Sequence, residues 1–167
     1  MQHAITVALE SGTRPVITVL GSNYDLLEKN LPGNSVDIVF NAAWQQGIAS
    51  SIHFGLNFLQ NKYPTVDAAV FMVCDQPFVS ASLIKELLDA QQKTGKPIAA
   101  SEYAGTIGTP ALFHQSMFAD LLQLKADNGA RKIIRQNPDL TVSVPFPQGN
   151  IDIDTSGDYS NLLKNGF

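Results

Sequence analysis

The chain has 167 residues, with 11 lysines and arginines against 15 aspartates and glutamates, so its formal net charge is −4. This length suits a single domain, residues 1–167, and the acidic balance argues against a broad basic face for nucleic acid or anionic lipid. The one cysteine, Cys74, excludes an intrachain disulfide and a cysteine zinc cluster, and the absence of a long apolar run leads us to expect a cytoplasmic protein with no membrane partner.

Short apolar runs alternate with stretches of helical periodicity along the whole chain, after a helix-like start over residues 2–10. The strand-like runs are 15–20, 36–40, 67–74, 97–100, 110–113 and 141–144. Further helices are expected from 22 or 23 to 31 and over 50–61, 80–93, 118–122, 127–136 and 155 or 156 to 164. This alternation predicts an α/β fold with a mainly parallel sheet, whose ligands bind at the carboxyl ends of the strands.

The run over residues 67–74 is apolar at almost every position, as in a strand covered on both faces, with Cys74 as an inert core thiol. Asp75 follows this strand directly, and Pro77 turns the chain away from it. A carboxylate at the end of a strand suits Mg²⁺, a hard cation that prefers oxygen ligands. The alternative is an aspartate that caps a helix or a turn.

A second acidic pair, Asp152 and Asp154, lies near the end of the chain. Alternation along an extended segment puts both carboxylates on one side. Two such groups repel unless they share a cation or a proton, which favours a metal site. The alternative is that Asp154 is the N-cap of the last helix.

Two serines begin the helix predicted after residue 47. The free N–H groups of a helix start, together with the hydroxyls of Ser50 and Ser51 after Gly47, can hold an anion or the edge of a base. Serine caps are common, so a structural role is the alternative.

Two further segments contain candidate ligand contacts. Residues 105–110 carry glycines that allow a ligand close to the backbone, although their composition is typical of a plain loop. Arg131, at the end of residues 127–131, has the fork geometry that binds a phosphate, against the alternative of a surface arginine.

Taken in order, these segments resemble the nucleotidyltransferases of the molybdenum cofactor, especially the cytidylyltransferase branch. The matching runs are 41–56 (NAAWQQGIASSIHFGL), 74–79 (CDQPFV), 108–113 (GTPALF), 126–131 (ADNGAR) and 152–158 (DIDTSGD). Cys74 stands where the family has a glycine. The resemblance spans essentially the whole chain, and five motifs in the correct order are far more specific than any one of them.

The resemblance implies a three-layer, Rossmann-like nucleotidyltransferase fold with a mostly parallel mixed sheet. It implies transfer of a nucleotidyl group from CTP or GTP to the terminal phosphate of molybdopterin, with Mg²⁺ as cofactor and release of pyrophosphate. The Ser50–Ser51 pair in its glycine context favours CTP. A monomer or homodimer is expected, with a molybdoenzyme as a further partner.

The resemblance also assigns roles to individual residues. Asp75 and Asp154 would be the catalytic residues that hold Mg²⁺, with Asp152 as a nearby helper. The nucleotide would also contact Gly47, Ser50 and Ser51. The residues that would face the pterin are Gly108, Thr109, Pro110, Asp127 and Arg131.

Members of this family begin with a strand and a glycine-rich loop that wraps the triphosphate, and neither is found in this sequence. The resemblance therefore implies an N-terminally truncated fold that binds triphosphate weakly and turns over poorly. The vacant strand position would be closed by direct pairing of the flanking strands or by a second chain. Two alternatives stay open, a nucleotide-sugar-dependent transferase that uses Asp152 and Asp154 as its metal motif, and a non-catalytic module that binds the pterin cofactor.

Overall fold

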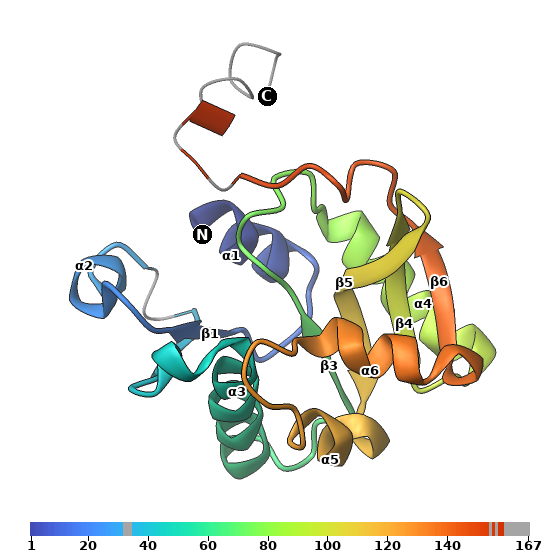
Figure 1. Ribbon diagram of the computed structural model, residues 1–167, viewed down its shortest axis with the longest axis horizontal. Coiled ribbons are helices and arrows are strands. Elements are labelled where there is room, and N and C mark those ends of the chain that lie inside the picture. The colour runs from blue at the N-terminus through green and yellow to red at the C-terminus, as the bar shows by residue number, and fades with distance from the viewer. Residues whose placement is uncertain (32–34, 154, 156, 159–167) are drawn as a thin grey trace.

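The computed structural model describes residues 1–31, 35–153, 155 and 157–158, and the strands in these residues form two sheets (Figure 1). In the smaller sheet, β1 (Ile17–Leu20) pairs in parallel with β2 (Asp37–Phe40). The larger sheet has, in spatial order, β3 (Ala68–Phe71), β5 (Thr106–His114), β4 (Ile98–Tyr103) and β6 (Thr141–Pro145). Strand β5 runs antiparallel to both of its neighbours, whereas β4 and β6 are parallel. The expected mixed α/β fold is confirmed.

Helices connect most of the strands, close to the predicted positions. They are α1 (Gln2–Glu10), α2 (Tyr24–Glu28), α3 (Ile48–Lys62), α4 (Ala81–Thr94), α5 (Phe118–Leu121) and α6 (Ala130–Gln136). Short 3₁₀ turns cover Trp44–Gln46, Gln115–Met117 and Pro138–Leu140. The helix expected from residue 155 or 156 to 164 lies mostly outside the described residues. None of the helices in the described part of the chain is long and apolar enough to cross a membrane.

Apolar side chains cover both faces of the larger sheet, because successive strand residues point to opposite sides. On one face, Ile98 and Phe113 pack in a cluster with residues of α3, α5 and α6. On the other face, Ala99 and Leu112 pack against α4 and against Val7 of α1. The larger sheet is therefore the middle layer of three, as expected from the resemblance.

Helix α4 begins and ends where its sequence predicts. The side chain of Ser80 accepts a hydrogen bond of 3.2 Å from the N–H of Leu83, which is the N-cap interaction. Gly95 ends the helix with a φ of +67°, a left-handed conformation that glycine adopts without strain.

The run over residues 67–74 packs on both faces of the larger sheet, with Ala69 and Phe71 in one apolar cluster and Ala68 and Val70 in the other, but it is not fully buried. Every residue of β3 is only partly buried, and Cys74 is exposed, so it is not a core thiol. In contrast, Ile98 and Ala99 of β4 have no exposed surface. The physical reason is that β3 is the edge strand of the larger sheet, with a paired neighbour on one side only in the described residues.

The plain loop expected over residues 105–110 is in fact mostly strand. A tight turn at Ala104 (φ +48°) and Gly105 (φ +70°) joins β4 to β5, and the pairing resumes at Thr106 opposite Tyr103. The glycines and proline of this segment suggested a loop, but only Gly105 serves the turn. The segment 108–110 lies within β5.

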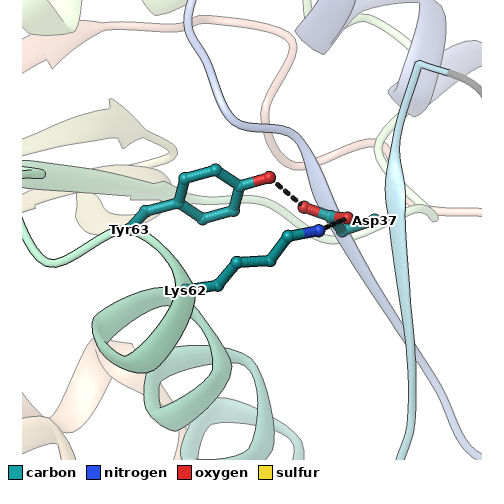
Figure 2. A network of polar contacts seen from close by, with 3 residues as sticks. All are labelled: Asp37, Lys62 and Tyr63. Atoms are coloured by element: carbon teal, nitrogen blue, oxygen red, sulfur yellow. Dashed lines mark hydrogen bonds and ion pairs between the residues drawn. The ribbon is translucent and has the colours of Figure 1, made fainter.

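The end of α3 is tied to the start of β2 by a polar network (Figure 2). The Nζ of Lys62 lies 2.5 Å from one carboxylate oxygen of Asp37, and the hydroxyl of Tyr63 donates a hydrogen bond of 2.6 Å to the other. Since α3 packs on β1 and β2, this network fixes the smaller sheet against its helix.

Candidate active site

The Asp75 segment lies directly against the acidic segment near the end of the chain. The backbone N–H of Ile153 donates a hydrogen bond of 2.8 Å to the carbonyl oxygen of Asp75. The side-chain amide of Gln76 donates a buried hydrogen bond of 2.9 Å to the carbonyl of Gly149. These two bonds place the segment that contains Asp152 beside the residues that follow β3. Asp154 lies outside the described residues.

The carboxylate of Asp75 has a buried oxygen atom that lacks a partner. Its Oδ1 atom is inaccessible to solvent and makes no hydrogen bond in the described residues. A buried acceptor without a donor is costly, and a bound cation would satisfy it. The Oε1 atom of Gln76 is also buried and also makes no hydrogen bond in the described residues. Two neighbouring residues therefore each have a buried oxygen atom without a partner.

The oxygen ligands that Asp75 offers suit a hard divalent cation. The described residues contain no group of three or more His, Cys, Asp or Glu side chains that could hold a metal, which argues against a fully protein-ligated site within them. Mg²⁺ does not need one, because it is usually held by one or two carboxylates together with waters and substrate phosphates. Asp75 is suited to be one such carboxylate.

Thr155 and Asp158 are joined by reciprocal hydrogen bonds. The N–H and the hydroxyl of Thr155 both donate to the Oδ2 of Asp158, at 2.8 Å each, and the N–H of Asp158 donates back to the hydroxyl at 3.2 Å. This reciprocal pattern is that of a capping box. Asp154, the cap that the sequence offers as an alternative to a metal ligand, lies outside the described residues.

A second polar cluster surrounds Asn41, which directly follows β2. Asn41 is fully buried, and its side-chain amide donates to the hydroxyls of Ser50 at 2.8 Å and Ser51 at 3.0 Å. The hydroxyl of Ser50 in turn donates to the carbonyl of Gly47 at 2.8 Å. A serine hydroxyl has one proton, so that of Ser50 is already committed. Ser51 accepts from Asn41, which leaves its own proton for a ligand.

Sequence reasoning gave Asn41 no role, although a signal for it exists. A polar residue that directly follows a strand is where the ligand-binding edge of an α/β sheet is expected. Asn41 meets that rule because it follows the last residue of β2, whereas Asp75 lies four residues beyond the end of β3.

The loop at Gly47 contacts the segment at Asp127, so two candidate groups meet. The N–H of Ala49 donates a hydrogen bond of 3.1 Å to the carbonyl of Ala126. A Cβ atom on Gly47 would lie 2.5 Å from both the carbonyl of Ala126 and the Oδ1 of Asp127. Only a glycine permits this approach.

Arg131 and Gly108 are neighbours at the start of β5. The guanidinium of Arg131 donates to the hydroxyl of Thr106 at 2.7 Å and to the carbonyl of Ile107 at 3.3 Å, and its Nε lies 3.6 Å from the Cβ position of Gly108. These bonds hold α6 against β5. They also occupy some of the guanidinium N–H groups that would otherwise bind a phosphate.

The remaining pterin-facing candidates differ in how accessible they are. Gly108 and Pro110 are buried within β5, whereas Thr109 between them is partly exposed. Asp127 is exposed. Thr109 and Asp127 are therefore the more accessible of these positions.

Comparison with known proteins identifies the family. The model of the MobA-like NTP transferase domain matches residues 1–141, which is most of the chain. None of the curated proteins matches. Among solved structures, a homologue of Mycobacterium tuberculosis Rv0371c from Mycobacterium sp. strain JC1 is 27% identical, with a TM-score of 0.82 over 98% of this chain and 81% of that chain.

Two more distant structures share the fold. Rv0371c from M. tuberculosis H37Rv, solved in complex with manganese, is 21% identical with a TM-score of 0.71 and covers 97% of this chain and 84% of that chain. The molybdopterin-guanine dinucleotide biosynthesis protein A of Archaeoglobus fulgidus is 16% identical with a TM-score of 0.65, over 98% of this chain and 84% of that chain. With the family match over most of its length, the chain belongs to the MobA-like NTP transferase domain family and is a nucleotidyltransferase.

Proposed function

We propose that this nucleotidyltransferase transfers the nucleotidyl group of CTP or GTP to the terminal phosphate of a molybdopterin-type substrate, with Mg²⁺ as the metal. The observation that carries the proposal is the hydrogen bond from Ile153 to the carbonyl of Asp75, because it brings the two acidic motifs together. The family description and the Archaeoglobus structure support the class of substrate. The manganese complex of Rv0371c supports a divalent cation.

In this reaction an oxygen of the acceptor phosphate forms a bond to the α-phosphorus of the triphosphate. The bond from the α-phosphorus to the bridging oxygen breaks, and pyrophosphate leaves with the bonding electrons. Such chemistry depends mostly on positioning and charge neutralisation. When bound, Mg²⁺ would neutralise charge that develops on the phosphate oxygens.

The acidic residues of this chain would hold the cation. Asp75 would contribute its buried, unpartnered Oδ1 atom. Asp154 would be the second ligand and Asp152 a helper. The hydrogen bond from the N–H of Ile153 to the carbonyl of Asp75 holds the backbones of the two acidic segments together. The carboxylates would therefore be positioned before the substrate arrives.

The serine cluster would receive the nucleoside. Ser51 has a proton to donate to a base, while Ser50 is occupied in holding Gly47. Asn41 would act as a positioning residue, because it holds both hydroxyls from a fully buried site. On the acceptor side, Thr109 and Asp127 would face the pterin, with Gly108, Pro110 and Arg131 shaping the wall behind them.

The test is transfer by the purified chain from α-phosphate-labelled CTP or GTP to molybdopterin in the presence of MgCl₂. Slow formation of the labelled dinucleotide and of equimolar pyrophosphate is expected, and Asp75→Asn should abolish both. The matched control is Asp67→Asn, which removes an exposed carboxylate just before β3, at its opposite end. Equal transfer by Asp75→Asn and the parent chain, or turnover of a sugar nucleotide with no product from molybdopterin, would overturn the proposal.

A further inference from the structure

Tyr103, the last residue of β4, carries a hydroxyl group at the edge of the larger sheet where the candidate site lies. Strands β3 and β4 both run antiparallel to β5, so Tyr103 ends β4 at the edge from which the chain leaves β3 toward Asp75. The side chain is partly exposed, and its hydroxyl makes no hydrogen bond to another residue in the described part of the chain. The hydroxyl is therefore available to a ligand.

Gly149 and Phe146 hold the ring of Tyr103 in place. A Cβ atom on Gly149 would lie 2.5 Å from Cδ1 and 2.7 Å from Cγ of the ring, so the ring fills the space that a side chain would need there. The ring of Phe146 packs edge-to-face against it, with the two centroids 6.1 Å apart. A hydroxyl on a ring held in this way loses little conformational entropy when it binds a ligand.

The contact with Gly149 also joins Tyr103 to the acidic site. The carbonyl of Gly149 accepts the buried hydrogen bond of 2.9 Å from Gln76, the residue after Asp75. Tyr103 therefore packs on the same segment that lies against the Asp75 region.

The hydroxyl end of the side chain lies beside Arg131. The hydroxyl oxygen is 2.5 Å, and the Nε of Arg131 is 3.6 Å, from the Cβ position of Gly108, so the two groups are neighbours. Arg131 donates to Ile107 and Thr106 through part of its fork, which leaves its other N–H groups for a ligand. A guanidinium beside a hydroxyl is a pair of donors that suits an anionic oxygen, above all that of a phosphate.

This pair of donors lies away from the groups proposed for the nucleoside. Asn41 and Ser51 belong to the end of β2 and to α3, whereas Tyr103 belongs to β4. Figure 1 shows β3, the strand that leads to Asp75, standing between the smaller sheet and β4. The acceptor phosphate must approach the α-phosphorus roughly in line with the leaving group, from a side that the nucleotide leaves open.

We propose that the hydroxyl of Tyr103, together with the remaining N–H groups of Arg131, binds the terminal phosphate of the acceptor. This inference rests on the nucleotidyl transfer proposed above and adds the residue that orients its nucleophile. The hydroxyl donates a hydrogen bond to a phosphate oxygen that does not react, and it keeps its proton. The charge of Arg131 offsets the repulsion between the acceptor phosphate and the triphosphate.

The test is equilibrium binding of molybdopterin to the purified chain, measured by isothermal titration calorimetry without oxygen, because binding requires no turnover. Tyr103→Phe keeps the ring and removes the hydroxyl, so it should weaken molybdopterin binding about tenfold, the effect of one hydrogen bond to a charged group. Its affinity for CTP or GTP should not change. The matched control is Tyr63→Phe, which removes a hydroxyl bonded to Asp37 at the start of β2 and should bind molybdopterin as the parent chain does.

A second probe shows which part of the ligand the hydroxyl contacts. Molybdopterin treated with a phosphatase lacks the terminal phosphate. The parent chain should bind this probe more weakly than molybdopterin, and Tyr103→Phe should bind it as the parent chain does.

A further variant tests where the hydroxyl lies. Gly108→Ala places a methyl group 2.5 Å from the hydroxyl oxygen of Tyr103, whereas Cζ of the ring is 3.3 Å from that position. Gly108→Ala should therefore lower the melting temperature and weaken molybdopterin binding in the parent chain, and it should have much smaller effects in Tyr103→Phe. Equal effects in the two backgrounds would show that the hydroxyl does not lie at Gly108.

The outcomes separate this inference from the proposed function. Equal affinity of Tyr103→Phe and the parent chain for molybdopterin overturns the inference and leaves the proposed function standing. An equal loss with the phosphatase-treated probe would place the hydroxyl at the pterin, and a loss confined to CTP or GTP would place it at the triphosphate; either result also overturns the inference. If the parent chain binds no molybdopterin, the proposed function and the inference are both wrong.

Discussion

The N–H of Ile153 donates a hydrogen bond of 2.8 Å to the carbonyl of Asp75, and this bond brings together two acidic motifs from distant parts of the sequence. Beside it, Gln76 reaches the carbonyl of Gly149 through a buried bond of 2.9 Å. The two bonds anchor the segment that leads to the end of the chain against the residues after β3. The two acidic segments are thus held together by one backbone bond and by the Gln76 side chain, and neither contact involves the carboxylates themselves.

The first prediction concerns divalent metal affinity. Asp75→Asn keeps the size of the side chain but removes its charge, so the chain should bind Mn²⁺ about tenfold more weakly or worse, a loss of about 1.4 kcal/mol or more. Electron paramagnetic resonance titration with Mn²⁺ measures this directly and does not require turnover. Asp67→Asn, the control just before the start of β3, should bind Mn²⁺ as the parent chain does. Unchanged affinity of Asp75→Asn would remove this aspartate from the metal site.

The second prediction concerns the buried amide of Asn41. Asn41→Ala removes the donor to Ser50 and Ser51 and the acceptor of a 2.9 Å bond from the N–H of Ala43. Because these partners are partly or fully buried, the loss should lower the free energy of unfolding by about 1–3 kcal/mol, measured by urea denaturation. The exposed Asn57 on α3 gives the control, and Asn57→Ala should change stability by no more than about 0.5 kcal/mol.

The same variant separates positioning from packing alone. If Asn41 holds Ser51 for the nucleoside, Asn41→Ala should weaken the binding of CTP or GTP at temperatures where the protein is still folded. Nucleotide affinity equal to that of the parent chain would leave Asn41 a purely structural role.

The third prediction concerns pH and the network in Figure 2. Hydrogen bonds from Lys62 and Tyr63 lower the pKa of Asp37 below its ordinary 3.8, and the bond to Asp37 raises the pKa of Lys62 above its ordinary 10.5. A lowered carboxyl pKa stabilises the fold above pH 3.8, and this contribution is lost as the pH falls through the folded-state pKa. A raised lysine pKa stabilises the fold below pH 10.5, and this contribution is lost as the pH rises through its folded-state value.

Asp37→Asn should therefore lower the melting temperature by a small amount at neutral pH, since both charged groups are partly exposed. The difference from the parent chain should disappear well below pH 3.8. Asp89→Asn, which removes a more exposed carboxylate 3.7 Å from Lys93, is the control and should have a smaller effect. A difference for Asp37→Asn that persists undiminished in acid would show that charge is not its cause.

Local chemistry is what made parts of this fold predictable from sequence. The limits of α4 follow from Ser80 and Gly95, because a capping hydroxyl and a left-handed glycine act within one turn of the helix. The boundaries of α1 were also correct, over residues 2–10. The apolar run over residues 67–74 also predicted a strand before Asp75, but β3 ends at Phe71, so Asp75 follows the strand at a distance of four residues.

The errors arise where distant segments decide the outcome. Residues 105–110 look like a loop, and only their pairing with β4 makes most of them strand. The composition of β3 indicates burial, but burial depends on a neighbour on each side, and the described residues supply one. The serine cluster shows the same limit, since the residue that organises it, Asn41, comes from a different element than the serines.

The last prediction concerns the contact between the serine loop and the segment before α6. Gly47 has a φ of +93° with extended ψ, a region that other residues rarely enter, and its Cβ position is already occupied by the carbonyl of Ala126. Gly95 also has a positive φ, of +67°, but its Cβ position is open. Gly95→Ala should therefore cost only the conformational strain, about 1 kcal/mol. Gly47→Ala adds a backbone clash and should cost about 1–3 kcal/mol more in urea denaturation.

Because the clash also pushes Asp127 away from the loop that carries Ser51, nucleotide binding should weaken in Gly47→Ala and stay unchanged in Gly95→Ala. Equal costs for the two variants would show that residues 47 and 126 are not packed as described.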